Sequence, residues 1–276
     1  MQQLQSYKAN PRPNVAVVSY LNTVPLIWGA IHGAQRDQMN VEFHLPSICA
    51  DKVRSEAADV GILPVIEIAR QRLEIFPGTG IASHGAVRSI LIISKVPFGN
   101  IKTLACDHGS RTSVMLARLI LREQFGASPL LLPPAAPELD TMLRSADAAL
   151  IIGDPALAID PETLEYEWLD LGHQWQVLTG LPMVFAVWAA AAHWITPQLE
   201  RAFSDSLTFG LSQMDRIVQE QSAQRGFAEI LIKQYLTKSI VFRLGPKDYE
   251  GMKTFLHLAS AIEPGLKCPI MEDALA

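Results

Sequence analysis

The chain has 276 residues, of which 49% are hydrophobic and 18% charged. This composition excludes a disordered chain, and the length allows one large domain or two modest ones. The formal net charge is −5 and Lys and Arg are not clustered, which argues against a nucleic-acid-binding protein. An anionic ligand would therefore depend on local hydrogen-bond donors rather than on the overall charge.

Residues 1–13 predict an N-terminal tail without a secretory signal, because they contain no apolar segment followed by a small-residue cleavage site. The longest apolar run, residues 183–192, is too short for membrane insertion, which needs about 20 residues. Cys49, Cys106 and Cys268 fit neither a disulfide framework nor a metal motif. We expect free thiols and a cytoplasmic protein.

The first part of the chain alternates predicted strands and helices. The β-branched run at residues 14–20 predicts a strand, and Pro25 and Gly33 suit the first turn and the end of the helix that follows. Further along, we expect a strand, a short helix and another strand, at residues 41–46, 50–58 and 59–65.

Residues 101–157 repeat that order. A strand at 101–106 leads through the loop 107–113 into a helix ended by Gly126, followed by strand, helix and strand. Two β-α-β-α-β units predict parallel sheets with helices on both faces, and such sheets bind ligands outside the carboxyl ends of their strands. If the two lobes face each other, the loop of Asn22 and the loop of Ser110 meet across a cleft.

The remaining segments complete the first lobe. Residues 75–94 predict two strands joined around His84-Gly85, and Gly180 predicts the end of a short helix. Residues 183–190 then predict a buried strand that returns to the first lobe, and residues 197–261 are mostly amphipathic helix. We expect lobe 1 to comprise residues 14–94 and 184–276 and lobe 2 to comprise residues 95–183. The chain then crosses between lobes near residues 94–97 and 179–184.

The segment Gly109-Ser110-Arg111-Thr112-Ser113 is the most informative local feature. It opens a predicted helix, whose free N–H groups and positive dipole end bind anions. The hydroxyls of Ser110, Thr112 and Ser113 add donors, and Arg111 has the geometry to clamp a carboxylate. The alternative is that Ser110 only caps the helix and Arg111 is only solvated. The preceding glycine and the position at the expected cleft favour the anion site.

Other candidates are weaker when taken from the residues alone. Asn22 is either a hydrogen-bond donor to a ligand or a turn residue that bonds its own backbone. Asp154 favours a helix cap, since Pro155 follows it, and Ser89 is an ordinary serine in a predicted strand. His84 and His108 lie in loops near the expected cleft. The seven histidines form no metal motif, so we expect no metal site.

Five motifs together resemble the chorismate dehydratase family of the futalosine route to menaquinone, over residues 14–260. They are SYLNTVPL at 19–26, ADVGILP at 58–64, SRTS at 110–113, GDPAL at 153–157 and TGLPMVFAVW at 179–188. The resemblance implies an α/β fold with two lobes, of the type II periplasmic-binding-protein kind, with a ligand cleft between the lobes. It also implies a cytoplasmic lyase that works without a metal or an organic cofactor.

The reaction implied by this resemblance removes water from chorismate, a small dianion, to give 3-[(1-carboxyvinyl)oxy]benzoate. The substrate's own enolpyruvyl carboxylate is then the base that takes the C3 hydrogen. Asn22 and Ser89 match positions associated with catalysis. Substrate-binding candidates lie in the matching motifs: Ser110, Arg111, Thr112, Ser113, Gly153, Asp154, Thr179 and Gly180.

Two alternatives remain open on the sequence. One is a non-catalytic protein of the same fold that binds a small anion. The other is the sister enzyme of the same pathway, which makes 1,4-dihydroxy-6-naphthoate. The segment Ser19-Tyr20-Leu21-Asn22-Thr23 favours the dehydratase. The sequence leaves the oligomeric state open.

Overall fold

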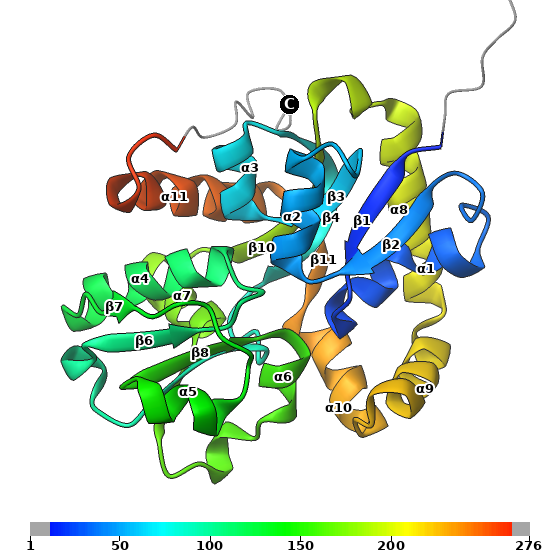
Figure 1. Cartoon of the computed structure of the whole chain (residues 1–276). Coiled ribbons are helices and arrows are strands. Elements are labelled where there is room, and N and C mark those ends of the chain that lie inside the picture. The colour runs from blue at the N-terminus through cyan, green and yellow to red at the C-terminus, as the bar shows by residue number, and fades with distance from the viewer. Residues whose placement is uncertain (1–11, 267–276) are drawn as a thin grey trace, which may run out of the picture.

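A computed structural model describes residues 12–266 of the chain (Figure 1). The protein has two lobes, each built on one β-sheet covered by helices, as the alternating pattern predicted. Residues 1–11 of the expected N-terminal tail and the last residues of lobe 1, including Cys268, lie outside the described residues. Cys49 and Cys106 are buried free thiols, as predicted. No helix in residues 12–266 combines the length and apolarity that a membrane crossing needs.

The first lobe contains a six-stranded sheet in the order β11-β4-β10-β3-β1-β2. Its strands are β1 (Asn14–Val18), β2 (Asn40–His44), β3 (Val60–Pro64), β4 (Glu74–Ser83), β10 (Met183–Ala190) and β11 (Val241–Arg243). A 3-10 turn, Leu21–Thr23, precedes the first of its helices, which are α1 (Val24–His32), α2 (Pro46–Arg54), α3 (Val65–Gln71), α8 (Pro197–Ser212), α9 (Met214–Arg225), α10 (Glu229–Gln234) and α11 (Pro246–Ile262). β1 is parallel to β2 and β3, and β10 is antiparallel to β3 and β4.

The second lobe contains a five-stranded sheet in the order β7-β6-β8-β5-β9. Its strands are β5 (Ile90–Ser94), β6 (Thr103–Cys106), β7 (Leu130–Leu131), β8 (Ala148–Ile152) and β9 (Glu167–Asp170). Its helices are α4 (Thr112–Phe125), α5 (Leu139–Ser145), α6 (Gly153–Ala158) and α7 (Leu171–Thr179). β5 is apolar up to its last residue, Ser94, and β8 is apolar throughout, and both strands are buried along their whole length.

The predicted repeat is confirmed by the strand order. The first unit gives β2-β1-β3 and the second gives β7-β6-β8, so the middle strand is the first of each unit. The helix ends are also confirmed: Gly33 ends α1, and Gly126 and Gly180 end α4 and α7 with φ of 67° and 72°. In both units the loop after the first strand therefore lies at the carboxyl edge of its sheet.

The predicted lobe boundary near residue 94 is wrong. β4 pairs within the first sheet, whereas β5 pairs with β8 and β9 of the second, so the chain crosses at residues 84–89. The Asp170 carboxylate accepts hydrogen bonds from the backbone N–H of Val87 (3.0 Å) and Arg88 (2.6 Å), and Arg88 has a φ of 67°. β4 and β5, although close in sequence, thus belong to different lobes. The segment between them, residues 84–89, bends the chain and is held by these hydrogen bonds. The return crossing, between α7 and β10, lies within the predicted range.

Close packing of α1 on α8 holds the start of the first unit in place. A Cβ on Gly210 of α8 would lie 2.1 Å from the carbonyl oxygen of Pro25, so only glycine allows this approach. Ser206, one turn earlier on α8, donates its hydroxyl to the carbonyl of Leu26 (2.8 Å) and accepts from the N–H of Ala30 (3.1 Å). The Asn22 turn immediately before α1 is positioned by this contact.

Candidate functional site

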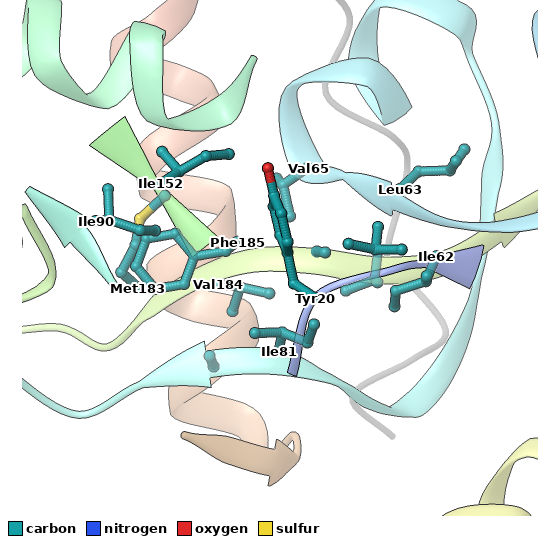
Figure 2. Close-up of a cluster of buried hydrophobic side chains, with 14 of the residues drawn as sticks. Tyr20, Ile62, Leu63, Val65, Ile81, Ile90, Ile152, Met183, Val184 and Phe185 are labelled. Carbon is teal, nitrogen blue, oxygen red and sulfur yellow. The ribbon is translucent and has the colours of Figure 1, made fainter. Parts of the chain in front are cut away.

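A pocket lies between the lobes at the carboxyl ends of β1 and β6, where the sequence predicts the cleft. Its cavity volume is about 60 Å³, which is well below the roughly 300–1,000 Å³ of typical small-molecule sites. Apolar walls come from both lobes, and Figure 2 shows Tyr20, Ile81, Ile90, Ile152 and Phe185 as members of one buried cluster. The predicted site residues that line the pocket are Asn22, Ser89, Arg111, Thr112, Ser113 and Gly153.

Tyr20 bridges the two lobes and was not predicted as a site residue. An added Cβ on Gly153 would lie 2.4 Å from the Tyr20 ring, and one on Gly109 would lie 3.1 Å from its hydroxyl. Gly153 also has a φ of 65°, which favours glycine. Burial, and secondarily the charges of Asp107 and Asp154, raise the pKa of Tyr20, so the phenol stays protonated. Gly153, which was predicted as a ligand contact, and Gly109, which was not, both make room for this ring.

Asn22 and Ser89 face the pocket from two sides of the crossing. The Asn22 Oδ1 atom is buried and has no hydrogen-bond partner among the described residues. The Ser89 hydroxyl accepts a hydrogen bond from the hydroxyl of Tyr235 (2.8 Å). A buried amide oxygen without a partner is costly, so a bound molecule that donates a hydrogen bond would relieve this cost.

The loop before α4 is organised by Asp107, which was not among the predicted site residues. Its buried carboxylate accepts from the N–H of Gly109 (2.8 Å) and of Ile152 (3.4 Å), and burial raises its pKa above the ordinary value. The Asp-x-Gly spacing is a turn signal from which this role could have been predicted. The loop is therefore held by a side chain beneath it, which leaves the first turn of α4 facing the pocket.

Ser110 and Thr112 differ from their predicted roles. The Ser110 hydroxyl is buried and unpartnered among the described residues, so it does not cap α4, and it lines an adjoining groove rather than the pocket. The Thr112 hydroxyl accepts from the N–H of Ile66 in lobe 1 (3.3 Å). Thr112 thus joins the lobes in addition to lining the pocket. Ser113 also lines the pocket, and its hydroxyl has no hydrogen-bond partner within residues 12–266.

Arg111 contacts lobe 1 rather than standing free in the pocket. Its Nη2 donates to both carboxylate oxygens of Asp51 (2.9 and 2.8 Å), and its Nη1 lies 3.1 Å from Glu67. Burial alone would raise the pKa of Glu67, but hydrogen bonds from Arg70 and Gln71 and the charge of Arg111 lower it below its ordinary value. Both Nη nitrogens of Arg111 are therefore engaged. The N–H groups predicted to bind a ligand carboxylate already contact the carboxylates of Asp51 and Glu67.

Asp154 is a second contact between the lobes, and its prediction as a helix cap is wrong. The residue before α6 is Ile152, and no side chain caps this helix. The Asp154 carboxylate instead accepts from the N–H of Leu21 (2.9 Å) and forms an ion pair with Arg225, at the end of α9. Arg225 also donates to the carbonyl of Ser19 (3.0 Å). Asp154 therefore fixes the turn that contains Asn22, through its bond to Leu21, and it does not line the pocket.

Thr179 and Gly180 lie away from the pocket. Both end α7, where the Thr179 hydroxyl donates to the carbonyl of Trp175 (2.8 Å). Their position follows from their role in stopping a helix that packs in lobe 2. The two histidines near the expected cleft are also engaged elsewhere, since His84 bonds Asp248 (2.9 Å) and His108 bonds the carbonyl of Ala135 (3.0 Å).

Comparison with known proteins decides the family. A family model described as menaquinone biosynthesis matches residues 13–261. The chain belongs to this family. It is also 30% identical, over 200 residues, to the chorismate dehydratase of Thermus thermophilus, a match that covers 66% of this chain and 72% of that protein.

Solved structures confirm the fold. Protein AF1704 from Archaeoglobus fulgidus superposes with a TM-score of 0.72 at 17% identity, covering 91% of this chain and 97% of that one. The periplasmic aliphatic sulphonate binding protein SsuA from Escherichia coli gives 0.61 at 14% identity, covering 91% and 86%. Protein CA3427 of Candida albicans, described as having the generic periplasmic binding protein fold, gives 0.64 at 15%, covering 92% and 91%. The predicted two-lobed fold is therefore correct.

The pocket of this menaquinone biosynthesis protein is largely apolar, with a few polar side chains contributed by both lobes. Among the described residues that line it, Arg111 is the only charged one, and its charge is shared with Asp51 and Glu67. An anion bound there would depend mainly on neutral donors: the N–H groups at the start of the 14-residue helix α4 and the hydroxyls around it. Neutral donors in a largely apolar pocket suit a reaction in which charge moves within the substrate.

Proposed function

We propose that this protein is a chorismate dehydratase, which converts chorismate to 3-[(1-carboxyvinyl)oxy]benzoate and water in the futalosine route. The observation that carries the proposal is the menaquinone biosynthesis match over residues 13–261, together with 30% identity to a curated chorismate dehydratase. The location in the cytoplasm is part of the proposal and rests on the resemblance seen in the sequence.

The reaction requires the loss of a hydrogen from C3 of the ring and of the hydroxyl from C4. In the proposed path the enolpyruvyl carboxylate of the substrate takes the C3 proton and leaves a carbanion at C3, whose electron pair then forms the new ring double bond as hydroxide leaves C4. The departing hydroxide and the abstracted proton together make water. The ring becomes aromatic, so the driving force lies in the substrate and the protein has to position groups rather than supply energy.

The residues around the pocket suit these requirements. The first turn of α4 and the Ser113 hydroxyl would hold one carboxylate of the dianion. Asn22 and Ser89 lie near the crossing, where a donor and an acceptor would contact the C4 hydroxyl as it leaves. Contacts between the lobes would keep water out and hold the carboxylate base against C3. Ser110, Asp154, Thr179 and Gly180 do not line the pocket, so the proposal gives them no contact with substrate.

The test is incubation of the purified protein with chorismate alone, followed by mass spectrometry. We expect a product lighter by one water, with the ultraviolet absorbance of a benzoate. The matched control is the double variant Asn22→Ala/Ser89→Ala at the same concentration, which corrects for spontaneous decay of chorismate.

Two other results would overturn the proposal. Chorismate that binds but stays unchanged would indicate a binding protein of the same fold. Conversion of the cyclised futalosine instead of chorismate would indicate the sister enzyme.

A further inference from the structure

We propose that Tyr235 is a positioning residue, which fixes the direction of the Ser89 hydroxyl so that its proton faces the pocket. Its effect on turnover rests on the proposed dehydratase function, whereas its effect on the group at position 89 does not. Tyr235 lies in no sequence motif that pointed to the site, and it approaches Ser89 from 146 residues further along the chain.

The hydrogen-bond geometry sets the direction of the serine proton. Tyr235 is 2% exposed and Ser89 is 1% exposed, so water does not compete for either hydroxyl. The single proton of the phenol points at Ser89 Oγ across 2.8 Å, which makes Ser89 the acceptor. The serine's own proton must then point elsewhere, and no acceptor for it is found among residues 12–266. Since Ser89 lines the pocket, that proton is available to a bound molecule.

Asn22 completes the arrangement on the other side of Tyr235. Burial, the largest influence, raises the pKa of Tyr235 well above its ordinary value, while hydrogen bonding with Ser89 and Asn22 lowers it in part. The Asn22 Oδ1 atom has no partner among the described residues, so the proposal has the Asn22 amide N–H, rather than Oδ1, face the phenol oxygen. In the proposed order, Asn22 donates toward Tyr235, Tyr235 donates to Ser89 (2.8 Å), and Ser89 donates into the pocket.

This order presents two complementary groups to a ligand. The Ser89 O–H is a donor and the Asn22 Oδ1 is an acceptor, and both line the same pocket. A substrate hydroxyl has one proton to donate and lone pairs to accept, so it would satisfy both groups together. Without the Tyr235 hydroxyl, the Ser89 proton could rotate away and Ser89 would no longer be held as a donor.

The local backbone explains how Tyr235 reaches this position. Helix α10 passes into a π-helical turn, Tyr235–Ser239, in which the N–H of Ile240 donates to the carbonyl of Tyr235 (3.2 Å). Such turns interrupt the ordinary helical repeat and are frequent at functional sites. The turn places a tyrosine from the C-terminal part of lobe 1 against the crossing between the lobes.

The first test is the steady-state kinetics of Tyr235→Phe, which removes only the hydroxyl. We expect kcat for chorismate to fall about 10-fold with KM changed less than about twofold, because an oriented donor acts on developing charge. In a Ser89→Ala background the same change should have no further effect on kcat. The control is Tyr249→Phe, since Tyr249 is also buried but bonds the N–H of Gly78 (2.6 Å) outside the pocket; its kcat should match the wild type. An unchanged kcat for Tyr235→Phe, or an equal loss with and without Ser89, would overturn the proposal.

The second test needs no activity. In a Ser89→Cys variant, the thiol pKa is measured from the pH dependence of alkylation by iodoacetamide, with peptide mass mapping to separate it from Cys49, Cys106 and Cys268. A Tyr235 donor stabilises the thiolate, so we expect Tyr235→Phe to raise that pKa by about one unit, a tenfold smaller thiolate fraction at a given pH. An unchanged thiol pKa would overturn the positioning role. A shifted pKa in a protein that leaves chorismate unchanged would overturn only the proposed function.

Discussion

Neutral side chains carry most of the chemistry that the pocket offers. Asn22 and Ser89 have no charge to bind the ground state strongly, but the Ser89 hydroxyl is held in place by a hydrogen bond from the buried Tyr235. A fixed donor loses little energy in reorganising when charge develops on the substrate. At the scale of single residues, the site is therefore better suited to speeding a reaction than to tight binding.

This property predicts the effect of removing either side chain. We expect Asn22→Ala and Ser89→Ala each to lower kcat for chorismate by about 10²–10³-fold, the usual cost of losing one preorganised donor. KM should change little. Asn100→Ala removes an exposed amide from lobe 2 and should leave both constants unchanged. If kcat is unchanged in both pocket variants, these positions are not catalytic.

A second prediction concerns the base. His84 and His108 are bonded to groups outside the pocket, and Glu67 and Asp154 are engaged by arginines. We expect His84→Ala, His108→Ala, Glu67→Gln and Asp154→Asn each to keep kcat well above the 10²–10⁴-fold loss typical of a missing general base. Circular dichroism should first show that each variant is folded.

The same reasoning predicts the pH dependence. A substrate carboxylate with an ordinary pKa near 4 stays ionised at higher pH, so kcat should not fall steeply between neutral and mildly acidic pH. If one of the four variants named for the base binds chorismate normally but is inactive, its residue is the base and the substrate-assisted path is wrong.

At the scale of elements, the site depends on how α1 docks on α8. Asn22 belongs to the turn that leads into α1, so its position follows from that contact. Gly210 lets the two helices approach until its backbone touches Pro25, and Ser206 ties α8 to the backbone of α1 by two hydrogen bonds. The Asn22 turn is thus positioned by a glycine that does not line the pocket.

Gly210→Ala tests this contact, because the expected change in the free energy of unfolding is opposite in sign to the change that helix propensity predicts. In an exposed helix the change would stabilise the protein by up to about 1 kcal/mol. Here the new Cβ would lie 2.1 Å from the Pro25 carbonyl oxygen, so we expect destabilisation of about 1–3 kcal/mol in urea unfolding, with a lower kcat. Ser212→Ala, at an exposed position of the same helix, is the control. A stabilised Gly210→Ala variant would mean that the helices are not in close contact.

At the scale of the whole molecule, residues on opposite lobes hold the pocket closed. Arg111 bonds Asp51 and Glu67, Asp154 bonds Arg225 and the backbone of Leu21, and Tyr20 packs on Gly153. These contacts surround the pocket. Binding that needs both lobes together is weakened when such contacts are lost, because less of the protein is in the competent state.

The pair of Arg111 and Asp51 distinguishes a role in closure from direct binding. We expect Arg111→Ala to raise KM about 10-fold and Asp51→Asn about threefold, with smaller effects on kcat, since the pair is partly exposed. The control is Arg122→Ala, which removes a cation from α4, the helix that Arg111 precedes. If Arg111 bound a substrate carboxylate directly, Asp51→Asn would free the guanidinium and lower KM instead.

The sequence by itself determined the features that depend on local pattern. Apolar periodicity and helix-ending glycines predicted the two repeated units, and the rule for parallel sheets placed the Asn22 loop and the 110–113 loop at facing edges. Both predictions are confirmed by the strand orders and by the pocket lining. They were accessible because each follows from neighbours within about ten residues and from one general rule of topology.

The tertiary structure decided which side chains meet. Tyr235 bonds Ser89 across 146 residues, Leu21 bonds Asp154 across 133, and Arg111 pairs with Asp51 across 60. β5 joined the second sheet although it follows β4 closely, because pairing with β8 and β9 outweighed nearness in sequence. Local pattern carries no information about such partners, since they are chosen by burial and hydrogen bonding when the two lobes come together.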